Sequence, residues 1–154
     1  MRAVIASDHA GFDYKTILLK DIEATGVEVK DLGAFSESAG DDYPDYAGYV
    51  AEAIISGKAE RGIIICGSGV GVSVAANKFK GIRAGVCHDT YSAHQSVEHD
   101  NANVLCMGER IIGIEVAREI VLAFLKAQFS NDPRHHRRVE KILAIENKNM
   151  KQEL

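Results

Sequence analysis

Short apolar runs alternate along the chain with longer amphipathic segments. Five of these runs are rich in valine and isoleucine and are bounded by glycine, aspartate or asparagine; they cover residues 3–7, 27–32, 62–66, 82–87 and 103–107. Continuously apolar runs of this length are typical of parallel strands that are buried on both faces of a sheet. The pattern therefore predicts five strands.

Apolar residues at helical spacing lie between and after these runs. A helix that begins near Pro44 is predicted by Ala47, Val50, Ala51 and Ile54. A longer helix is predicted by Ala117, Ile120, Val121, Phe124 and Leu125. The last helix is marked by Val139, Ile142 and Leu143. Strand and helix alternate five times before the terminal helix. This order predicts one α/β domain over residues 1–146, with a five-stranded parallel sheet covered by helices on both faces, followed by a polar, frayed tail at 147–154.

Composition narrows the functional class. The chain has 154 residues, of which 46% are hydrophobic and 26% charged, as in an ordinary globular protein. Its net charge is -4, whereas a nucleic-acid-binding protein usually has an excess of basic residues. No apolar run approaches the roughly 18 residues of a membrane span, and the N-terminal apolar stretch is too short for a signal peptide. We therefore expect a cytoplasmic protein without nucleic-acid or membrane partners.

The three cysteines are Cys66, Cys87 and Cys106, and all lie in apolar, strand-like stretches. Their odd number argues against a disulfide framework, and free cysteines in such stretches are usually small buried hydrophobes.

Reactive residue types cluster after the predicted strands. Ligands of an open parallel sheet bind at the carboxyl ends of its strands. Nearly all of the reactive residue types fall in the five segments that follow the runs, namely 8–11, 33–45, 67–71, 88–90 and 108–110. This clustering predicts a site at that edge of the sheet.

The strongest local motif is the glycine-rich turn at 67–71, which follows Cys66 and leads into a predicted helix over about 70–77. Backbone N–H groups in such a turn, together with the helix dipole, form a pocket for negative charge. A shift of a thiol pKa from about 8.5 to about 7 needs roughly 2 kcal/mol, which such a pocket could supply. The alternative is that the glycines only permit tight packing and that Cys66 belongs to the core.

A nucleotide cofactor is disfavoured. Asp89 lies about 20 residues after the turn, as a ribose-binding acid would, but Val72 stands where the dinucleotide fingerprint needs its third glycine, and no Lys-Ser or Lys-Thr pair forms a P-loop. Zinc is disfavoured at His135 and His136, because adjacent helical residues point in different directions and no other ligand has metal spacing.

Three other positions could carry chemistry. Asp8 suits a helix N-cap, and His9 beside it could bind an anion. His99, near the end of a predicted helix, could interact with the helix dipole or transfer protons at neutral pH. Arg134 and Arg138 are four residues apart at the start of the last helix, where positive charge is slightly unfavourable and a bound phosphate would explain it.

At these residues the chain resembles ribose-5-phosphate isomerase type B, a family that also includes galactose-6-phosphate isomerase subunits. The matching motifs span almost the whole chain; they are Ser7-Asp8-His9-Ala10-Gly11, Tyr43-Pro44-Asp45, Cys66-Gly67-Ser68-Gly69-Val70-Gly71, Ala75-Ala76-Asn77-Lys78, Gly81-Ile82-Arg83-Ala84, Glu98-His99, Asn101-Ala102-Asn103, Gly108-Glu109-Arg110, and Arg134-His135 with Arg137-Arg138. The resemblance implies a Rossmann-like three-layer sandwich and a homodimer, or dimer of dimers, with active sites completed across the interface. It also implies interconversion of ribose 5-phosphate and ribulose 5-phosphate, in the pentose phosphate pathway, without metal or cofactor.

The resemblance assigns roles to particular residues. Cys66 would be the base that moves the proton between C1 and C2, Ser68 would assist it, and His99 would open the sugar ring. The turn residues Gly67, Ser68, Gly69, Val70 and Gly71 would hold the enediolate oxygens. The other substrate-binding residues would be Asp8, Tyr43, Asp45 and Asp100 for the sugar, and His9, Arg110, Arg134 and Arg138 for the phosphate and neighbouring hydroxyls.

The sequence departs from the family pattern in two places. Ser68 stands where threonine is common, which keeps the hydroxyl but loses a stiffening methyl group. Asp100 stands where asparagine is frequent, so its sugar contact is in doubt and it would raise the basicity of His99. Some members use a glutamate just after the turn as base; Val72 occupies that place here, which leaves Cys66.

Several alternatives stay open at this point. The substrate could be a hexose 6-phosphate of the allose or galactose type. The same loops could serve a non-catalytic module that binds a sugar phosphate or a nucleotide, or a flavodoxin-like redox protein.

Overall fold

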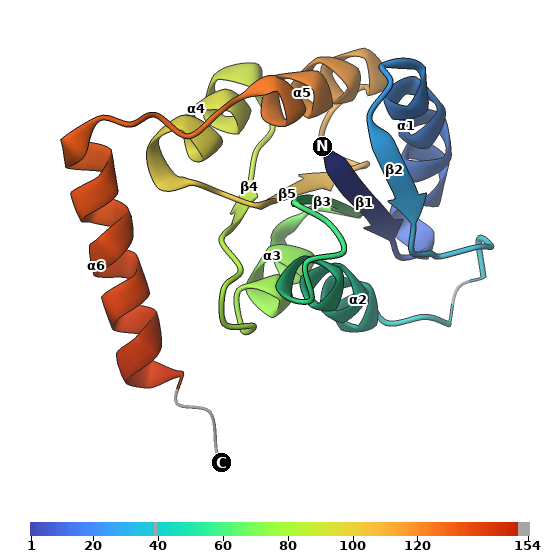
Figure 1. The fold of residues 1–154 in the computed structure, drawn as a ribbon. Coiled ribbons are helices and arrows are strands. Elements are labelled where there is room, and N and C mark those ends of the chain that lie inside the picture. The colour runs from blue at the N-terminus through green and yellow to red at the C-terminus, as the bar shows by residue number, and fades with distance from the viewer. Residues whose placement is uncertain (39, 151–154) are drawn as a thin grey trace.

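Five parallel strands form a single sheet in the order β2-β1-β3-β5-β4 (Figure 1). The computed structural model describes residues 1–38 and 40–150. The strands are β1 (Arg2–Ser7), β2 (Glu28–Asp31), β3 (Arg61–Cys66), β4 (Ala84–Val86) and β5 (Val104–Gly108). Each lies within, or one residue beyond, one of the apolar runs, so the predicted parallel sheet is confirmed.

Helices cover both faces of the sheet, as predicted (Figure 1). One face carries α1 (Phe12–Ala24), α4 (Thr90–Asp100) and α5 (Ile114–Lys126), and the other carries α2 (Tyr43–Ile55) and α3 (Val70–Ala76). A short 3-10 turn, η1 (His9–Gly11), joins β1 to α1. The result is a three-layer α/β sandwich, to which α6 (Pro133–Asn149) is added at one side.

The central strand β3 shows why its run is continuously apolar. Ile63 and Ile65 pack into the cluster beneath α1, α4 and α5, whereas Ile64 and Cys66 pack into the cluster on the α2–α3 side. Successive side chains of a strand point to opposite faces, so burial of both faces removes the polar alternation. Cys66 is the last residue of β3 and lies opposite Gly108 of β5.

The edge strand β4 is shorter than the run at 82–87 suggested. Two asparagine side chains replace part of its ladder. Asn103 Oδ1 accepts from the Arg83 N–H at 2.8 Å, and the Asn77 amide bonds both the N–H and the carbonyl of Ala84 at 2.9 Å. Side chains thus satisfy the Arg83 N–H and both backbone groups of Ala84, while the Arg83 carbonyl accepts from the backbone N–H groups of Asn103 and Val104.

Helix α6 continues past residue 146, where the sequence suggested that the polar tail begins. Glu146 accepts a hydrogen bond from the Gly81 N–H at 2.8 Å, which fixes the far end of α6 to the body. Ile142 and Ile145 nevertheless stay 40% and 63% exposed. Residues 151–154 of the expected tail lie outside the described residues. Within the described part of the chain, every helix is too short or too polar to cross a membrane.

Candidate active site

A cavity of about 410 Å³ opens at the carboxyl ends of β1 and β3. Its lining consists of Asp8, His9, Ala10, Tyr43, Cys66, Gly67, Ser68, Gly71, Arg110 and Ile111. Apart from Ala10 and Ile111, these are residues that the sequence predicted for the site. A larger hollow of about 570 Å³ lies beside β2 and α2, but neither a cysteine nor a histidine lines it. We call the first the cysteine cavity.

Cys66 combines burial with access to this cavity. Its residue surface is only 5% exposed, yet it belongs to the cavity lining. The backbone N–H of Gly69 donates a hydrogen bond to Cys66 Sγ over 3.1 Å. A hydrogen-bond donor therefore faces the sulfur at the edge of the cavity.

The glycines of the turn are also needed for packing. Gly69 has a φ of +79°, and a Cβ there would lie 2.8 Å from the carbonyl carbon of Met107 in β5. A Cβ on Gly108 would lie 2.6 Å from the Cα of Ser68. The turn therefore packs directly on the end of β5. The two interpretations of the motif, tight packing and an anion pocket, are compatible.

Tyr43 and Ser68 form another part of the cavity wall. Tyr43 begins α2, and its ring would lie 2.8 Å from a Cβ at Gly71. Ser68 is exposed, and its Oγ accepts from the Val70 N–H at 3.3 Å. The hydroxyl thus sits at the mouth of the turn, where a substrate oxygen could replace the Val70 contact.

Asp8 and His9 follow β1 directly. Asp8 Oδ1 accepts from the Ala10 N–H at 3.0 Å, which confirms the predicted N-cap, although the capped element is η1. Asp8 is 6% exposed, and this burial raises its pKa despite the nearby His9 and the backbone donors.

His9 is held by a carboxylate that the sequence analysis did not single out. His9 Nδ1 lies 2.6 Å from Asp41 Oδ1, which also accepts from the His9 backbone N–H at 3.2 Å. Burial opposes ionisation of Asp41, but the bonds from His9 and Tyr46 bring its pKa below the ordinary value. Nδ1 therefore carries the proton, and Nε2 is the ring nitrogen left for a ligand.

Arg110 brings positive charge to the same opening. Its backbone N–H donates to the Gly67 carbonyl at 3.1 Å, and its Nη1 would lie 3.3 Å from a Cβ at Gly67. The guanidinium therefore lies over the turn, and residue Arg110 is exposed at the rim. With the turn and His9, it makes the cavity suited to an anionic ligand.

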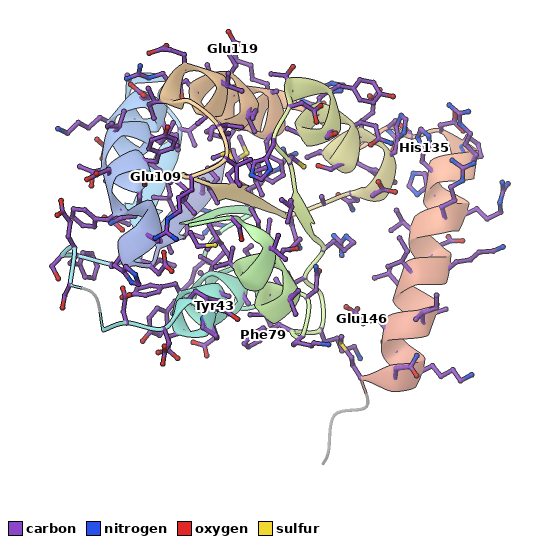
Figure 2. All side chains as sticks on the ribbon, turned by 180° about the vertical axis from the view of Figure 1, so that it is seen from behind. Tyr43, Phe79, Glu109, Glu119, His135 and Glu146 are labelled. Atoms are coloured by element: carbon purple, nitrogen blue, oxygen red, sulfur yellow. The ribbon has the colours of Figure 1, made fainter. Side chains whose placement is uncertain are left out.

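The remaining charged residues lie elsewhere. His99 and Asp100 end α4, while Arg134 and Arg138 lie on the first turns of α6. None of these four lines the cysteine cavity. Figure 2 shows the separation between Tyr43, beside the cavity, and His135, at the start of α6. We call these four residues the histidine–arginine cluster.

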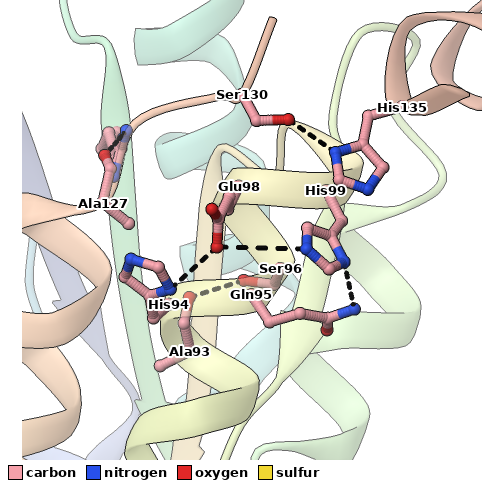
Figure 3. Close-up of polar contacts among 10 residues, drawn as sticks. Ala93, His94, Gln95, Ser96, Glu98, His99, Ala127, Ser130 and His135 are labelled. Carbon is pink, nitrogen blue, oxygen red and sulfur yellow. Dashed lines mark hydrogen bonds and ion pairs between the residues drawn. The ribbon is translucent and has the colours of Figure 1, made fainter. Parts of the chain in front are cut away.

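His99 is held on two sides within this cluster. Gln95 Nε2 lies 2.9 Å from His99 Nδ1, and the ring of His135 stacks on the His99 ring with centroids 4.0 Å apart (Figure 3). Arg134 contacts Asp132 at 3.1 Å, and both Arg138 and Asp100 are exposed. One chain thus presents two separate sets of predicted site residues.

Three further predicted residues do not line the cavity. Gly69 is buried beneath the turn, Val70 is 55% exposed at the start of α3, and Asp45 is exposed on the first turn of α2. Among the residues at positions 1–38 and 40–150, no group of three or more histidine, cysteine, aspartate or glutamate side chains could hold a metal ion.

Sequence reasoning missed four residues around these two sets: Asp41, Gln95, Ile111 and His135 as a partner of His99. Gln95 is four residues before His99 on one helix, so its contact follows from helical spacing. Asp41 is brought to His9 by the loop between β2 and α2, and no local signal reveals that contact.

Comparisons with known proteins identify the family of this chain. The Ribose/Galactose Isomerase family matches residues 3–142. The chain is 50% identical to "Ribose-5-phosphate isomerase B" of Escherichia coli over 139 residues, which cover 90% of this chain and 92% of that protein. It is 44% identical to "D-erythrulose-4-phosphate isomerase 2" of Mycolicibacterium smegmatis, covering 95% and 97% of the two chains. The solved ribose-5-phosphate isomerase B of Clostridium thermocellum superposes with a TM-score of 0.92 at 47% identity, covering 96% of this chain and 99% of that one.

Proposed function

Since this chain belongs to the Ribose/Galactose Isomerase family, we propose that it interconverts ribose 5-phosphate and ribulose 5-phosphate by proton transfer between C2 and C1. The observation that carries the proposal is the position of Cys66. Its sulfur accepts a hydrogen bond from Gly69 and lines a cavity whose other walls suit an anionic sugar.

The chemistry follows from that position. The Cys66 thiolate takes the proton from C2 of the open-chain aldose, and the electron pair forms the C1–C2 double bond of an enediolate with its charge on O1. The thiol then returns the proton to C1, while the O2 proton passes to O1 and the carbonyl forms at C2. A positioned base of this kind contributes about 10²–10⁴-fold.

The turn at 67–71 and Ser68 would stabilise the enediolate oxygens. Preorganised donors act more strongly on charge that develops in the transition state, and loss of one such donor costs about 3 kcal/mol. Asp8 would accept from sugar hydroxyls, while His9 and Arg110 would bind the phosphate end or its neighbouring hydroxyls. Binding of the unreactive phosphate then holds C1 and C2 beside Cys66.

The histidine–arginine cluster would complete the site of a second copy of the chain. The cysteine cavity of the same chain is not lined by His99, Asp100, Arg134 or Arg138, so these four residues have no role there. Exposed apolar side chains accompany both sets. Near the cavity, Val70, Val74 and Ile111 are 55%, 57% and 56% exposed, and on α6 Ile142 and Ile145 are exposed as well. Such surfaces are typical of protein interfaces. The proposed assembly is a homodimer, alone or as half of a tetramer, with shared active sites.

Mixed dimers test this sharing. Cys66→Ala and His99→Asn chains are each expected to be almost inactive from ribose 5-phosphate. If each site takes Cys66 from one chain and His99 from the other, an equal mixture regains about a quarter of the wild-type sites, because half of the dimers are mixed and each restores one site. An inactive mixture, with mixed dimers verified by native mass spectrometry, would place both residues in one chain and overturn the shared site.

The role of Cys66 is tested by Cys66→Ala, with Cys87→Ala as the matched control, because both remove a buried thiol. We expect the first to lose at least about 100-fold in turnover and in exchange of solvent deuterium into C2 of ribose 5-phosphate. The control is expected to retain both. Near-normal turnover or exchange in Cys66→Ala would overturn Cys66 as the base.

His99 would open the furanose ring by moving a proton between O1 and the ring oxygen. Ribulose 5-phosphate needs no such step, because its O5 carries the phosphate and its other hydroxyls cannot close a stable ring on C2. We therefore expect the kcat of His99→Asn, measured at saturating substrate, to fall far more from ribose 5-phosphate than from ribulose 5-phosphate. Equal losses in the two directions would contradict the ring-opening role.

A four-carbon substrate is the second candidate, because the Mycolicibacterium relative is named for D-erythrulose 4-phosphate. Ribose 5-phosphate, erythrose 4-phosphate, allose 6-phosphate and galactose 6-phosphate assayed side by side would rank the aldoses by kcat/KM. We expect ribose 5-phosphate to have the highest kcat/KM; a higher value for another sugar would make that sugar the substrate.

As part of the same proposal we place the enzyme in the cytoplasm, since its three free thiols suit a reducing compartment.

A further inference from the structure

His135 occupies an unusual place for a residue of the exposed start of α6. It is 3% exposed, whereas Arg134, His136, Arg137 and Arg138 around it are exposed. Its Nδ1 lies 2.5 Å from Ser130 Oγ, and the Ser130 N–H donates to the Glu98 carbonyl at 3.0 Å. The start of α6 is thereby fixed to the end of α4, next to His99.

The ring of His135 covers one face of the His99 ring. The centroids lie 4.0 Å apart and the ring planes differ by 28°, as in a stacked pair (Figure 3). Gln95 holds His99 Nδ1 from within α4, and His99 Nε2 lies 3.9 Å from Glu98 Oε2. One ring nitrogen and one ring face of His99 are therefore occupied, while 29% of its side-chain surface remains exposed.

The contact with Ser130 accounts for only one of the two ring nitrogens of His135. Its Nε2 is buried and has no hydrogen-bond partner within the part of the chain that the structure describes. An unpaired buried polar group costs about 1–3 kcal/mol. An apolar ring of similar shape would avoid that cost, although it would lose the contact with Ser130.

The surroundings of His135 favour its neutral form. Burial, and then the charges of His99 and Arg134, hold the pKa of His135 below its ordinary value. The charged groups around the pair are Asp132, Arg134 and Arg138 from α6 and its cap, and Glu98 from α4. A neutral ring tolerates an imidazolium beside it, whereas a second imidazolium at this distance would repel it.

We propose that His135 is a positioning residue for His99: its stacked ring fixes the plane of the His99 imidazole, so that Nε2 meets the substrate's ring oxygen in one orientation. This inference rests on the ring-opening role proposed for His99. His135 contacts neither substrate nor reacting atoms and acts only through His99.

The test compares His135→Asn, which removes the stacked ring, with His135→Phe, which keeps a flat ring on His99. His136→Asn is the matched control, because His136 is the exposed neighbour on the same helix. For His135→Asn we expect kcat from ribose 5-phosphate to fall about 10-fold or more, since small misplacements of catalytic groups have effects of up to about 10²-fold. Consumption of ribulose 5-phosphate should change little, and it reports that the variant is folded and assembled.

His135→Phe should recover most of the forward rate, and His136→Asn should resemble the wild type in both directions. The proposal is overturned if His135→Asn leaves the forward rate unchanged, if both directions fall together, or if His135→Phe is as slow as His135→Asn. His99→Asn in the same assay separates the two levels: if it fails to slow the forward direction selectively, the ring-opening role itself is wrong, whatever His135 does.

Discussion

The backbone N–H of Gly69 points at Cys66 Sγ over 3.1 Å, which gives this thiol a hydrogen-bond donor at the edge of a cavity. The other two cysteines have different surroundings. Burial raises the pKa of Cys87, and the completely buried Cys106 has a strongly raised pKa for the same reason. The fold therefore distinguishes one thiol from two others of the same chain.

The first prediction is selective alkylation. Because the thiolate is the reactive form, iodoacetamide at neutral pH should modify Cys66 well before Cys87 and Cys106 in the native protein. Peptide mapping by mass spectrometry after short exposures measures the order. Ribose 5-phosphate should slow the modification of Cys66, since it would occupy the cavity. Modification of Cys87 or Cys106 first would contradict the assignment.

The second prediction concerns the turn itself. Gly69→Ala places a side chain at a φ of +79° and 2.8 Å from the Met107 backbone. Gly57→Ala is the matched control, with a φ of +72° and no atom within 4 Å of the added Cβ. The control should lose about 1 kcal/mol of unfolding free energy from backbone strain alone.

Gly69→Ala should lose more, because the turn must move away from β5, and its Cys66 should alkylate more slowly as the Gly69 donor shifts. Urea unfolding and the alkylation rate measure the two effects. Equal losses of stability in both variants, with unchanged alkylation, would mean that β5 does not hold the turn in place.

Most of the fold was predictable because the apolar runs of the three inner strands β1, β3 and β5 are buried on both faces. Ile63, Ile64 and Ile65 leave no polar position that could suggest another element, and the glycine turn marks where β3 ends. The short β4 was not predictable, because the side chains of Asn77 and Asn103, which lie outside the apolar run, take over hydrogen bonds at its start. Nor was the length of α6, whose polar end is held by the contact from Glu146 to Gly81.

The site was predictable only in part, for a similar reason. Residues that directly follow strands, such as Asp8 and Cys66, meet at one sheet edge because parallel strands carry them there. Asp41 belongs to a long loop, and its contact with His9 depends on how that loop folds back over β1. The family resemblance assigned both His99 and Cys66 to an active site completed across a dimer interface, and within a single chain the two residues lie in separate sets.

The third prediction follows from the contact between Asp41 and His9. Asp41→Ala frees the His9 ring to rotate, so the KM for ribose 5-phosphate should rise about 10-fold, the value expected when a charge-assisted hydrogen bond is lost. The kcat should change little, because C1 and C2 lie at the other end of the substrate. Glu37→Ala, on the same loop and exposed, is the control. A lower kcat with an unchanged KM would remove His9 from phosphate binding.

The fourth prediction uses the raised pKa of Asp8. A carboxyl group whose pKa is higher in the folded state binds its proton more tightly there, so its contribution favours folding at low pH and is lost as pH rises through the folded-state pKa. Asparagine does not titrate but can still accept from the Ala10 N–H as an N-cap. The stability of Asp8→Asn relative to the wild type should therefore increase from below about pH 4 up to neutral pH.

The same substitution should lower kcat/KM by about 10- to 100-fold, because a carboxylate accepts from sugar hydroxyls more strongly than an amide does. Urea unfolding across the pH range and steady-state kinetics at neutral pH measure the two effects on one variant. A stability difference that does not change with pH would show that Asp8 is not destabilised by burial of its charge. A variant that is more stable at neutral pH and yet slower would show that the buried charge of Asp8 is maintained for binding at the expense of folding.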